Sequence, residues 1–271
     1  MHLHLVREPS SDDVARYSDL RSSQQQDHFI AEGEKVVSRL LESTFHIDSI
    51  YLTPEHFDLK RSLIESHRQS EEIRVLLGSK AEMERIVGFP LHQGIMASAR
   101  IPTSPDLSGL IALAPHPHLY VLLDQIADAE NMGAIYRTAL AMGATAIIVD
   151  RKSVSPWNRR SVRVSMGAIF HLPTVMVPEL AASVHTLRDH GVRTYATTLS
   201  TSASDLRETP LGGDIGLVFG SEGYGVQPSV IAECEGEVTL PMPQSIDSLN
   251  VAVAQGVFLY EALRQRGLRA K

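Results

Sequence analysis

The chain has 271 residues, of which 43% are hydrophobic, and this is enough apolar material for two domains with cores of their own. Its formal net charge of −7 argues against nucleic acid as a partner unless basic residues gather locally. A single cysteine excludes an intramolecular disulfide, and neither a secretory signal nor an apolar run of the about 20 residues that span a bilayer is evident, so we expect a soluble, cytoplasmic protein.

The N-terminal part of the chain reads as a small α/β unit. Helical spacing runs from Glu32 to Ser43, and strand-like runs follow from His46 to Thr53 and from Ile73 to Gly78. The sequence AEMERIVG lies between the second of these strands and a last candidate strand, IMASAR. Helical and strand periodicities that alternate in this way indicate one compact α/β domain.

A proline-rich segment from Ile101 to His118 separates this unit from the rest of the chain. Proline fixes φ and lacks a backbone donor, so four prolines in this stretch predict a break in regular structure. We therefore expect an N-terminal domain at 1–105 and a C-terminal domain at 117–271.

Downstream of this boundary, strand-like and helical segments alternate. The strand-like runs are LYVLLD, TAIIVD, TVMV, VRTYAT, IGLVFG and EVTLP. The helical segments are NMGAIYRTALAMG, ELAASVHTLRDH and LNVAVAQGVFLYEALRQRG. This order predicts an α/β fold in which helices cover both faces of a mostly parallel sheet.

The first helix after LYVLLD carries three notable residues within two turns. They are the polar Asn131, Gly133, which has no side chain, and the permanently charged Arg137. Such a group is suited to hold a phosphate or an oxyanion, because a ligand can approach over the glycine and meet the guanidinium. The simpler interpretation is a solvated Arg137 and an ordinary helix cap at Asn131. This pattern alone leaves both interpretations open.

Two loops follow strands at the edge where ligands bind in parallel sheets. The loop FGSEGYG surrounds one carboxylate, Glu222, with glycines that allow a close backbone approach. The loop LPMPQSIDSLN is bracketed by prolines, and we expect it to start the last helix at Asp247 to Asn250. Here too a simpler interpretation exists, in which the glycines only form a turn and Asp247 or Ser248 only caps a helix.

One stretch of the chain is basic without any acid among its cations. It contains Arg151, Lys152, Arg159, Arg160 and Arg163. Such a patch is either a solvated face or a surface that binds RNA phosphates.

Three segments together resemble, in order and spacing, the signature motifs of the TrmH/SpoU family of RNA ribose 2′-O-methyltransferases in the SPOUT superfamily. They are NMGAIYRTA at 131–139, LVFGSEGYGV at 217–226 and LPMPQSIDSLNVAVAQG at 240–256. The resemblance covers Leu119 to Gly267, and the N-terminal region resembles the family's L30e-like RNA-binding domain. Ala129 and Ala252 depart from the family pattern without removing a side chain assigned to chemistry.

The resemblance implies a SPOUT α/β domain with a trefoil knot and a mostly parallel sheet, preceded by a small L30e-like α/β domain. It also implies a homodimer packed through the knot and the last helix. The apolar stripe Leu249, Val253, Val257 and Tyr260 suits that packing and equally suits the chain's own core. The implied activity is methyl transfer from S-adenosyl-L-methionine to a ribose 2′-hydroxyl of ribosomal or transfer RNA.

The resemblance also assigns roles to residues. The catalytic set is Arg137, Asn131, Glu222, Ser248 and Asn250, and the cofactor-binding set is Thr198, Gly220, Gly223, Leu240, Met242 and Leu249. The basic stretch, Arg151, Lys152, Arg159, Arg160 and Arg163, would contact RNA. Because a guanidinium is effectively never deprotonated, Arg137 is expected to bind a phosphate and stabilise negative charge rather than to act as a base.

Three other functions compete with this one. The main alternative is a non-catalytic RNA-binding protein of the same fold, such as a ribosome assembly factor. A nucleotide-dependent oxidoreductase is disfavoured because FGSEGYG reads G-x-x-G-x-G late in the chain. A hydrolase or metal enzyme is disfavoured because G-x-S-x-G is missing and His116 and His118 have no acidic or cysteine cluster nearby in the sequence. We therefore expect no bound metal.

Overall fold

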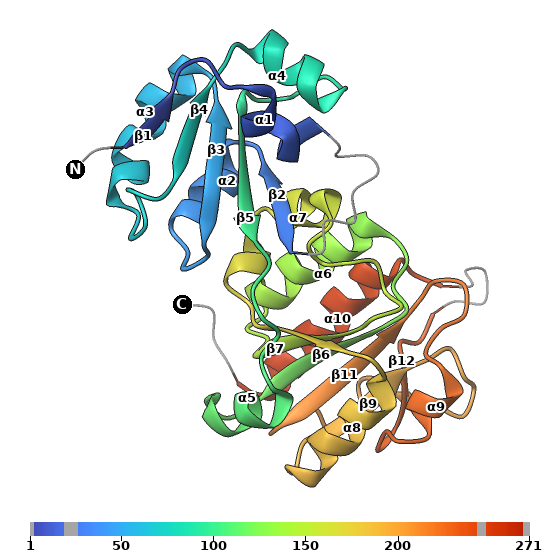
Figure 1. The fold of residues 1–271 in the computed structure, drawn as a ribbon. Coiled ribbons are helices and arrows are strands. Elements are labelled where there is room, and N and C mark those ends of the chain that lie inside the picture. Colours follow the sequence, from blue (N-terminus) through green and yellow to red (C-terminus); the bar gives the residue numbers. More distant parts are fainter. Residues whose placement is uncertain (1–2, 19–26, 243–247, 268–271) are drawn as a thin grey trace. The chain divides into compact units, whose positions relative to one another are not determined.

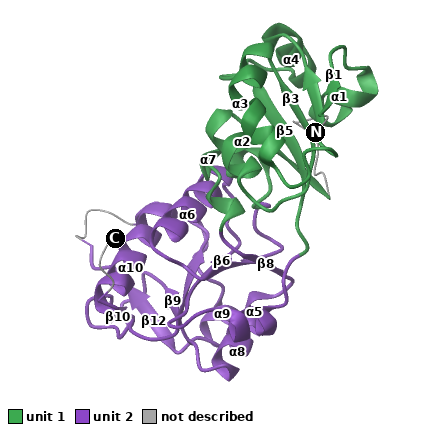
Figure 2. Ribbon diagram, turned by 90° about the vertical axis from the view of Figure 1, so that its left-hand side faces the viewer, with its two compact units in different colours: residues 1–103, 156–171 green, residues 104–155, 172–271 purple. Residues whose placement is uncertain are grey.

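The computed structural model describes residues 3–18, 27–242 and 248–267, and the chain divides into two compact units (Figure 2). Unit 1 comprises residues 1–103 and 156–171, and unit 2 comprises residues 104–155 and 172–271. The first crossing between the units lies inside the proline-rich segment. The return of 156–171 to unit 1 was not indicated by any sequence pattern.

Unit 1 contains a five-stranded sheet of order β1-β4-β3-β5-β2. Its strands are β1 His4–Val6, β2 His28–Glu32, β3 Ile47–Leu52, β4 Arg74–Leu77 and β5 Ile95–Arg100. Its helices are α1 Ser11–Ser18, α2 Glu34–Leu41, α3 Pro54–Ser66, α4 Lys80–Val87, α7 Arg159–Val164 and the short 3-10 helix η1 Ala168–Phe170. β3 pairs in parallel with β4 and antiparallel with β5, which also pairs antiparallel with β2.

Local signals explain where several of these elements begin and end. The Thr53 hydroxyl accepts a hydrogen bond from the backbone N–H of His56, and Pro54 opens α3 without losing a needed donor. Ser79 and Glu82 form a reciprocal capping box at the start of α4, and Gly88 ends that helix with a left-handed φ of 78°. The predicted helix from Glu32 begins at Glu34 instead, because His28–Glu32 pairs with β5 as a strand.

The returning segment 156–171 is anchored to unit 1 by an aromatic cluster and an ion pair. Phe29 lies 5.2 Å from Trp157 and 5.7 Å from Phe170 between ring centroids. Glu32, whose side chain is only 4% exposed, accepts a 2.6 Å bond from Arg159. The Arg159 guanidinium also lies over the Phe89 ring, 4.1 Å from its centroid. A buried carboxylate therefore holds a cation that the sequence assigned to RNA.

Unit 2 contains a seven-stranded sheet of order β10-β12-β9-β11-β6-β7-β8, in which every pairing is parallel. Its strands are β6 Leu119–Asp124, β7 Ala146–Asp150, β8 Thr174–Val177, β9 Arg193–Thr197, β10 Ser204–Asp205, β11 Ile215–Gly220 and β12 Gly236–Thr239. Its helices are α5 Leu107–Leu113, α6 Ala129–Ala141, α8 Leu180–Asp189, α9 Pro228–Ile231 and α10 Val251–Gln265.

Helices cover both faces of this sheet (Figure 1). On one face, residues of α5, α8 and α9 pack on alternate strand residues such as Tyr120 and Leu122. On the other face, α6 and α10 lie side by side, and Phe258 of α10 packs edge-on against Phe219 of β11. The helix α5 corrects the expectation of irregular structure at 101–118, because Asp106 caps it and its residues Leu107 and Ile111 enter the core.

None of the helices in the described part of the chain combines the length and the apolar character that crossing a bilayer demands. The trefoil knot implied by the resemblance stays a prediction.

We predict that Arg159→Met destabilises the protein by about 3 kcal/mol, because it leaves the buried Glu32 carboxylate without its closest partner. The matched variant Arg163→Met removes a cation 3.8 Å from the same carboxylate and is expected to cost less than about 1 kcal/mol. Urea unfolding of the full chain measures both values. Equal, small losses would show that the pair with Arg159 does not hold Glu32.

Candidate functional site

Two neighbouring strands of unit 2 end together at the point where the sheet changes direction. The chain runs from β6 outward through β7 to β8 and then returns to β9 and β11 on the other side of β6. Asp124 and Gly220 are the last paired residues of β6 and β11. Their following loops therefore leave side by side at a topological switch point, the position where ligands bind in sheets of this kind.

The buried carboxylate of Asp124 ties these loops together. It accepts a 2.6 Å hydrogen bond from the backbone N–H of Gln227, which lies at the end of the loop after β11. Burial raises the pKa of Asp124, and the bond from Gln227 opposes that effect. The carboxylate thus fixes the loop through one backbone donor.

The loop after β11 folds back onto itself at Gly220. A Cβ at this position would lie 2.0 Å from the carbonyl carbon of Gly225, so only glycine fits. Gly225 has a left-handed φ of 67°, and its N–H donates to the carbonyl of Ser221 at 2.8 Å. The glycines of FGSEGYG thus set the shape of the loop, beyond forming an ordinary turn.

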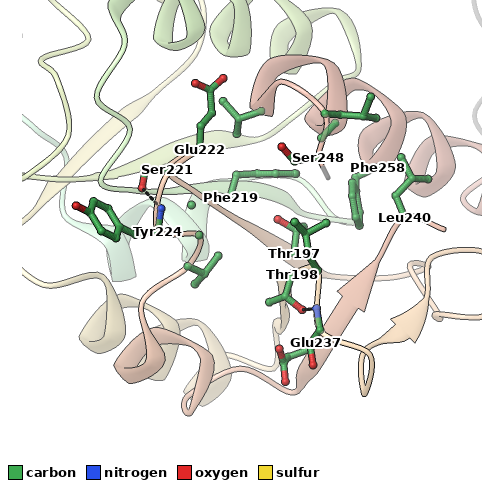
Figure 3. A pocket seen from close by; sticks show the side chains of 18 of the residues that line it. Thr197, Thr198, Phe219, Ser221, Glu222, Tyr224, Glu237, Leu240, Ser248 and Phe258 are labelled. Carbon is green, nitrogen blue, oxygen red and sulfur yellow. Dashed lines mark hydrogen bonds between the residues drawn. The ribbon is translucent and has the colours of Figure 1, made fainter. Parts of the chain in front are cut away.

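A cavity of about 450 Å³ lies beneath this loop, at the carboxyl ends of β9, β11 and β12 (Figure 3). All six residues predicted to bind the cofactor line it: Thr198, Gly220, Gly223, Leu240, Met242 and Leu249. Its lining also includes Thr197, Phe219, Glu237 and Phe258, which the sequence did not single out. Their position at strand ends or on the helix beside them is the signal that could have found them.

Three of the predicted catalytic residues form one hydrogen-bonded network at the cavity. Asn250 caps α10, and its Oδ1 accepts from the backbone N–H groups of Ala252 and Val253. Its Nδ2 therefore points away from the helix and donates to Asn131 Oδ1 at 2.8 Å and to Glu222 Oε1 at 3.0 Å. Asn131 Nδ2 donates to the same Glu222 oxygen at 2.9 Å.

Helix caps explain this geometry and correct two expectations. Asp128, rather than Asn131, caps α6, and this frees the Asn131 side chain in the first helical turn. Asn250, rather than Ser248, caps α10, whose first residue is Val251. The predicted start at Asp247 lies outside the described residues. Ser248 lines the cavity and is exposed.

Arg137 is not brought into this network. It is exposed on α6 and does not belong to the described residues that line the cavity. Gly133, one turn earlier, is buried, so the expected approach of a ligand over the glycine is wrong. The sequence correctly placed both residues on one helix but could not show which face the core covers.

The predicted RNA contacts fall into two groups. Arg151 and Lys152 are exposed in the turn after β7 of unit 2. Arg159, Arg160 and Arg163 lie on α7 of unit 1, where Arg159 and Arg163 face Glu32 and Arg160 is exposed. Burial lowers the pKa of Arg159, and the Glu32 carboxylate opposes that effect. Arg159 therefore has a structural partner already.

A second cluster of polar residues lies at the amino ends of the unit 2 strands, opposite the cavity. Asp214 contacts both His116 and His118, and its carboxylate accepts a 2.6 Å hydrogen bond from the backbone N–H of His118. The sequence-based expectation that these histidines lack an acidic neighbour is thus wrong. The carboxylate is distant along the chain and is brought near by the pairing of β11 with β6.

Known proteins similar to this chain include several RNA methyltransferases. A model of the SpoU rRNA Methylase family matches residues 118–260, and a model described as RNA 2′-O ribose methyltransferase substrate binding matches residues 30–105. The 23S rRNA (guanosine-2′-O-)-methyltransferase RlmB of Xanthomonas campestris pv. campestris is 36% identical over 206 residues, which are 75% of this chain and 82% of that relative.

Solved structures confirm the predicted α/β fold with a mostly parallel sheet. The AdoMet-bound rRNA methyltransferase from Sinorhizobium meliloti has a TM-score of 0.81 and 25% identity, with 96% of this chain and 98% of that chain covered. The SpoU methyltransferase AviRb from Streptomyces viridochromogenes, in complex with the cofactor AdoMet, has a TM-score of 0.78 and 25% identity, with 93% and 97% covered.

We predict that Gly220→Ala destabilises the protein by at least about 2 kcal/mol, because the added methyl group would overlap the backbone of Gly225. Gly223→Ala is the matched control in the same loop. Its Cβ would meet nothing within 4 Å, so its effect should stay within about 0.5 kcal/mol. Urea unfolding distinguishes the two, and a tolerated Gly220→Ala would refute the tight turn.

Proposed function

The chain belongs to the SpoU rRNA methylase family, and we propose that it transfers a methyl group from S-adenosylmethionine to a ribose 2′-hydroxyl of ribosomal RNA. One observation carries the proposal: the second and third signature segments line one cavity, and the first is joined to them through Asn131, which is hydrogen-bonded to Glu222 and Asn250. A polar network beside an apolar cavity suits a reaction in which a cofactor and an RNA hydroxyl must be aligned.

The cavity fits the cofactor in size and in chemistry. A volume of about 450 Å³ suits a small organic ligand. Leu240, Leu249 and Phe258 offer apolar faces to an adenine ring, while Thr198 and Glu237 offer polar groups to the rest of the molecule. When bound, S-adenosylmethionine supplies an electrophilic methyl group on a sulfonium sulfur.

The hydrogen-bonded network would position the ribose that receives the methyl group. Both amide donors end on Oε1 of Glu222, so Oε2 remains to accept from a ribose hydroxyl. Because the backbone of α10 fixes the Asn250 amide, Glu222 is held in place before RNA arrives. Preorganisation of this kind lowers the barrier by avoiding reorganisation during the reaction.

Arg137 would act through its charge. Its guanidinium is exposed on α6, which also carries Asn131. Because a guanidinium holds its proton at neutral pH, it has no free lone pair with which to act as a base. We assign it to the phosphate beside the target ribose, where it would stabilise the negative charge that develops on the 2′-oxygen. Ser248 lines the cavity and would contact the same ribose.

The proposed RNA is ribosomal because the curated relatives are 23S rRNA methyltransferases and because a substrate-binding model matches residues 30–105. The proposed phosphate contacts are the cations that lie exposed, Arg151, Lys152 and Arg160. A ribosomal RNA substrate and a single cysteine both support a cytoplasmic location.

We also propose a homodimer formed through α10. Val253, Val257 and Tyr260 are 56%, 37% and 59% exposed on one side of this helix, while Val251, Phe258 and Leu259 face the core. An exposed apolar stripe on an otherwise packed helix suits a second copy of the same surface. Leu249 lines the cavity, so the predicted stripe is shorter by one residue.

We predict that Arg137→Ala leaves the affinity for S-adenosylmethionine within about twofold but lowers methyl transfer at least about 100-fold, as expected for loss of a group that stabilises developing charge. Calorimetry measures cofactor binding, and label from the methyl-labelled cofactor measures transfer to unmodified ribosomal and transfer RNA. Arg207→Ala, which removes another exposed arginine, is the control.

Weaker cofactor binding with transfer retained at saturating cofactor would refute the assignment of Arg137. Label in neither RNA pool from the unaltered protein, despite RNA binding, would favour the non-catalytic RNA-binding protein.

We predict that the protein sediments as a dimer and that Val253→Glu converts it to a monomer, because a charge would be buried in the apolar interface. Leu59→Glu, which changes a residue 71% exposed on α3, is the matched control and should leave the dimer intact. A monomeric unaltered protein, or a Val253→Glu variant that still sediments as a dimer, would refute this interface.

A further inference from the structure

The cluster His116, His118 and Asp214 lies at the amino ends of β6 and β11, whereas the cavity lies at the carboxyl ends of the unit 2 strands. His118 directly precedes β6, and Asp214 directly precedes β11. The first residues of these strands, Leu119 and Ile215, are paired in register, so the two flanking segments start from adjacent points. The fold thus brings together three side chains that commonly bind transition metals.

The nitrogen and oxygen atoms of this cluster converge on one point. His116 Nδ1 lies 2.8 Å and 3.0 Å from the two oxygens of Asp214, and His118 Nδ1 lies 3.7 Å from Oδ1. One ligand atom from each residue lies within 4.8 Å of the others. Zinc bonds of about 2.0–2.2 Å in tetrahedral geometry place ligand atoms about 3.4 Å apart, so Zn²⁺ would displace the proton of the His116–Asp214 hydrogen bond and widen that contact slightly.

The hydrogen bonding of His118 points to a cation. Its Nε2 lies 3.1 Å from the carbonyl oxygen of Ala114, which can only accept, so Nε2 carries a proton. In the neutral ring Nδ1 then has no proton and carries a free lone pair. This atom is fully buried, has no hydrogen-bond partner among the described residues and faces the Asp214 carboxylate. The buried Nδ1 therefore faces a carboxylate oxygen of Asp214, whose side chain is 25% exposed, and a metal ion between the two atoms would stabilise this arrangement.

The surroundings supply the second shell of such a site. The Ala114 carbonyl fixes the His118 ring in the way that outer carbonyls orient metal-bound histidines. The backbone N–H of His118 holds the Asp214 carboxylate in place through Oδ1.

The nearby cation Arg266 does not replace a metal. Its guanidinium donates to the backbone carbonyls of Pro117, His118 and Gly213, and so holds the two segments that carry the ligands. Within residues 3–18, 27–242 and 248–267, no ion pair within 4 Å joins Arg266 to Asp214, whose two oxygens instead contact His116 and His118.

We propose that His116 Nδ1, His118 Nδ1 and an oxygen of Asp214 bind one Zn²⁺, with water as the fourth ligand. The ion joins the segment before β6 to the segment before β11 and stabilises their pairing. Because the ligands lie at the amino ends of β6 and β11, away from the cavity, the site is structural and takes no part in the chemistry of methyl transfer.

The test uses the full-length protein without an affinity tag, freed of metal by a chelator and then titrated with Zn²⁺. Calorimetry and elemental analysis should give one ion per chain, and the midpoint of thermal unfolding should rise with Zn²⁺. His116→Ala should weaken Zn²⁺ binding at least about 10–100-fold, the loss seen even for outer-shell partners. Its ring is mostly exposed, so this variant should fold.

His185→Ala is the matched control, because His185 also lies beside two carboxylates, those of Asp189 and Glu233, but on the surface of α8. It should leave Zn²⁺ binding unchanged. Asp214→Asn should abolish binding. Binding that His116→Ala does not weaken, or a metal-free protein whose unfolding midpoint ignores Zn²⁺, would overturn the proposal. Methyl transfer need not be measured, so failure of this site and failure of the proposed function are distinguishable.

Discussion

The pairing of β6 with β11 is the constraint on which the rest of unit 2 depends. Six register pairs join these strands in parallel, from Leu119 with Ile215 to Asp124 with Gly220. Parallel strands in register deliver both carboxyl ends to one point, and the sheet changes direction there. Residues far apart in the sequence, such as Asn131 and Glu222, are therefore neighbours without any direct local signal.

Backbone requirements, rather than side-chain attraction, then set the polar geometry of the site. The N-terminal N–H groups of α10 need an acceptor, and the Asn250 oxygen meets that need. Once its oxygen is committed, its amide can only donate outward, and this fixes both the Asn131 amide and the Glu222 carboxylate. An ordinary helix cap thus becomes the fixed point of the network.

Sequence patterns predicted most of the strands of both sheets because buried parallel strands leave continuous apolar runs such as LYVLLD. They failed at β2, where residues up to Glu32 pair with β5 instead of starting a helix. They also failed at α5, where the Asp106 cap starts a helix inside the proline-rich segment. The resemblance of the motifs to a known family, rather than periodicity, pointed to the six predicted cofactor residues that line the cavity. The motifs did not reveal that Arg159 pairs with Glu32, because ion pairs between distant segments leave no periodic trace.

The same ladder that assembles the cavity also separates it from the histidine cluster. At about 3.3 Å per residue, five steps from Leu119 to Asp124 span about 17 Å, so the two edges cannot share a ligand. Yet both edges depend on the same six pairs. A cation that joins His118 to Asp214 would hold the register at one end, and a shift by one residue there would turn every side chain of β11 to the opposite face. The geometry of the cavity at the carboxyl ends of β6 and β11 therefore depends on correct pairing at their amino ends, although the cavity and the histidine cluster do not touch.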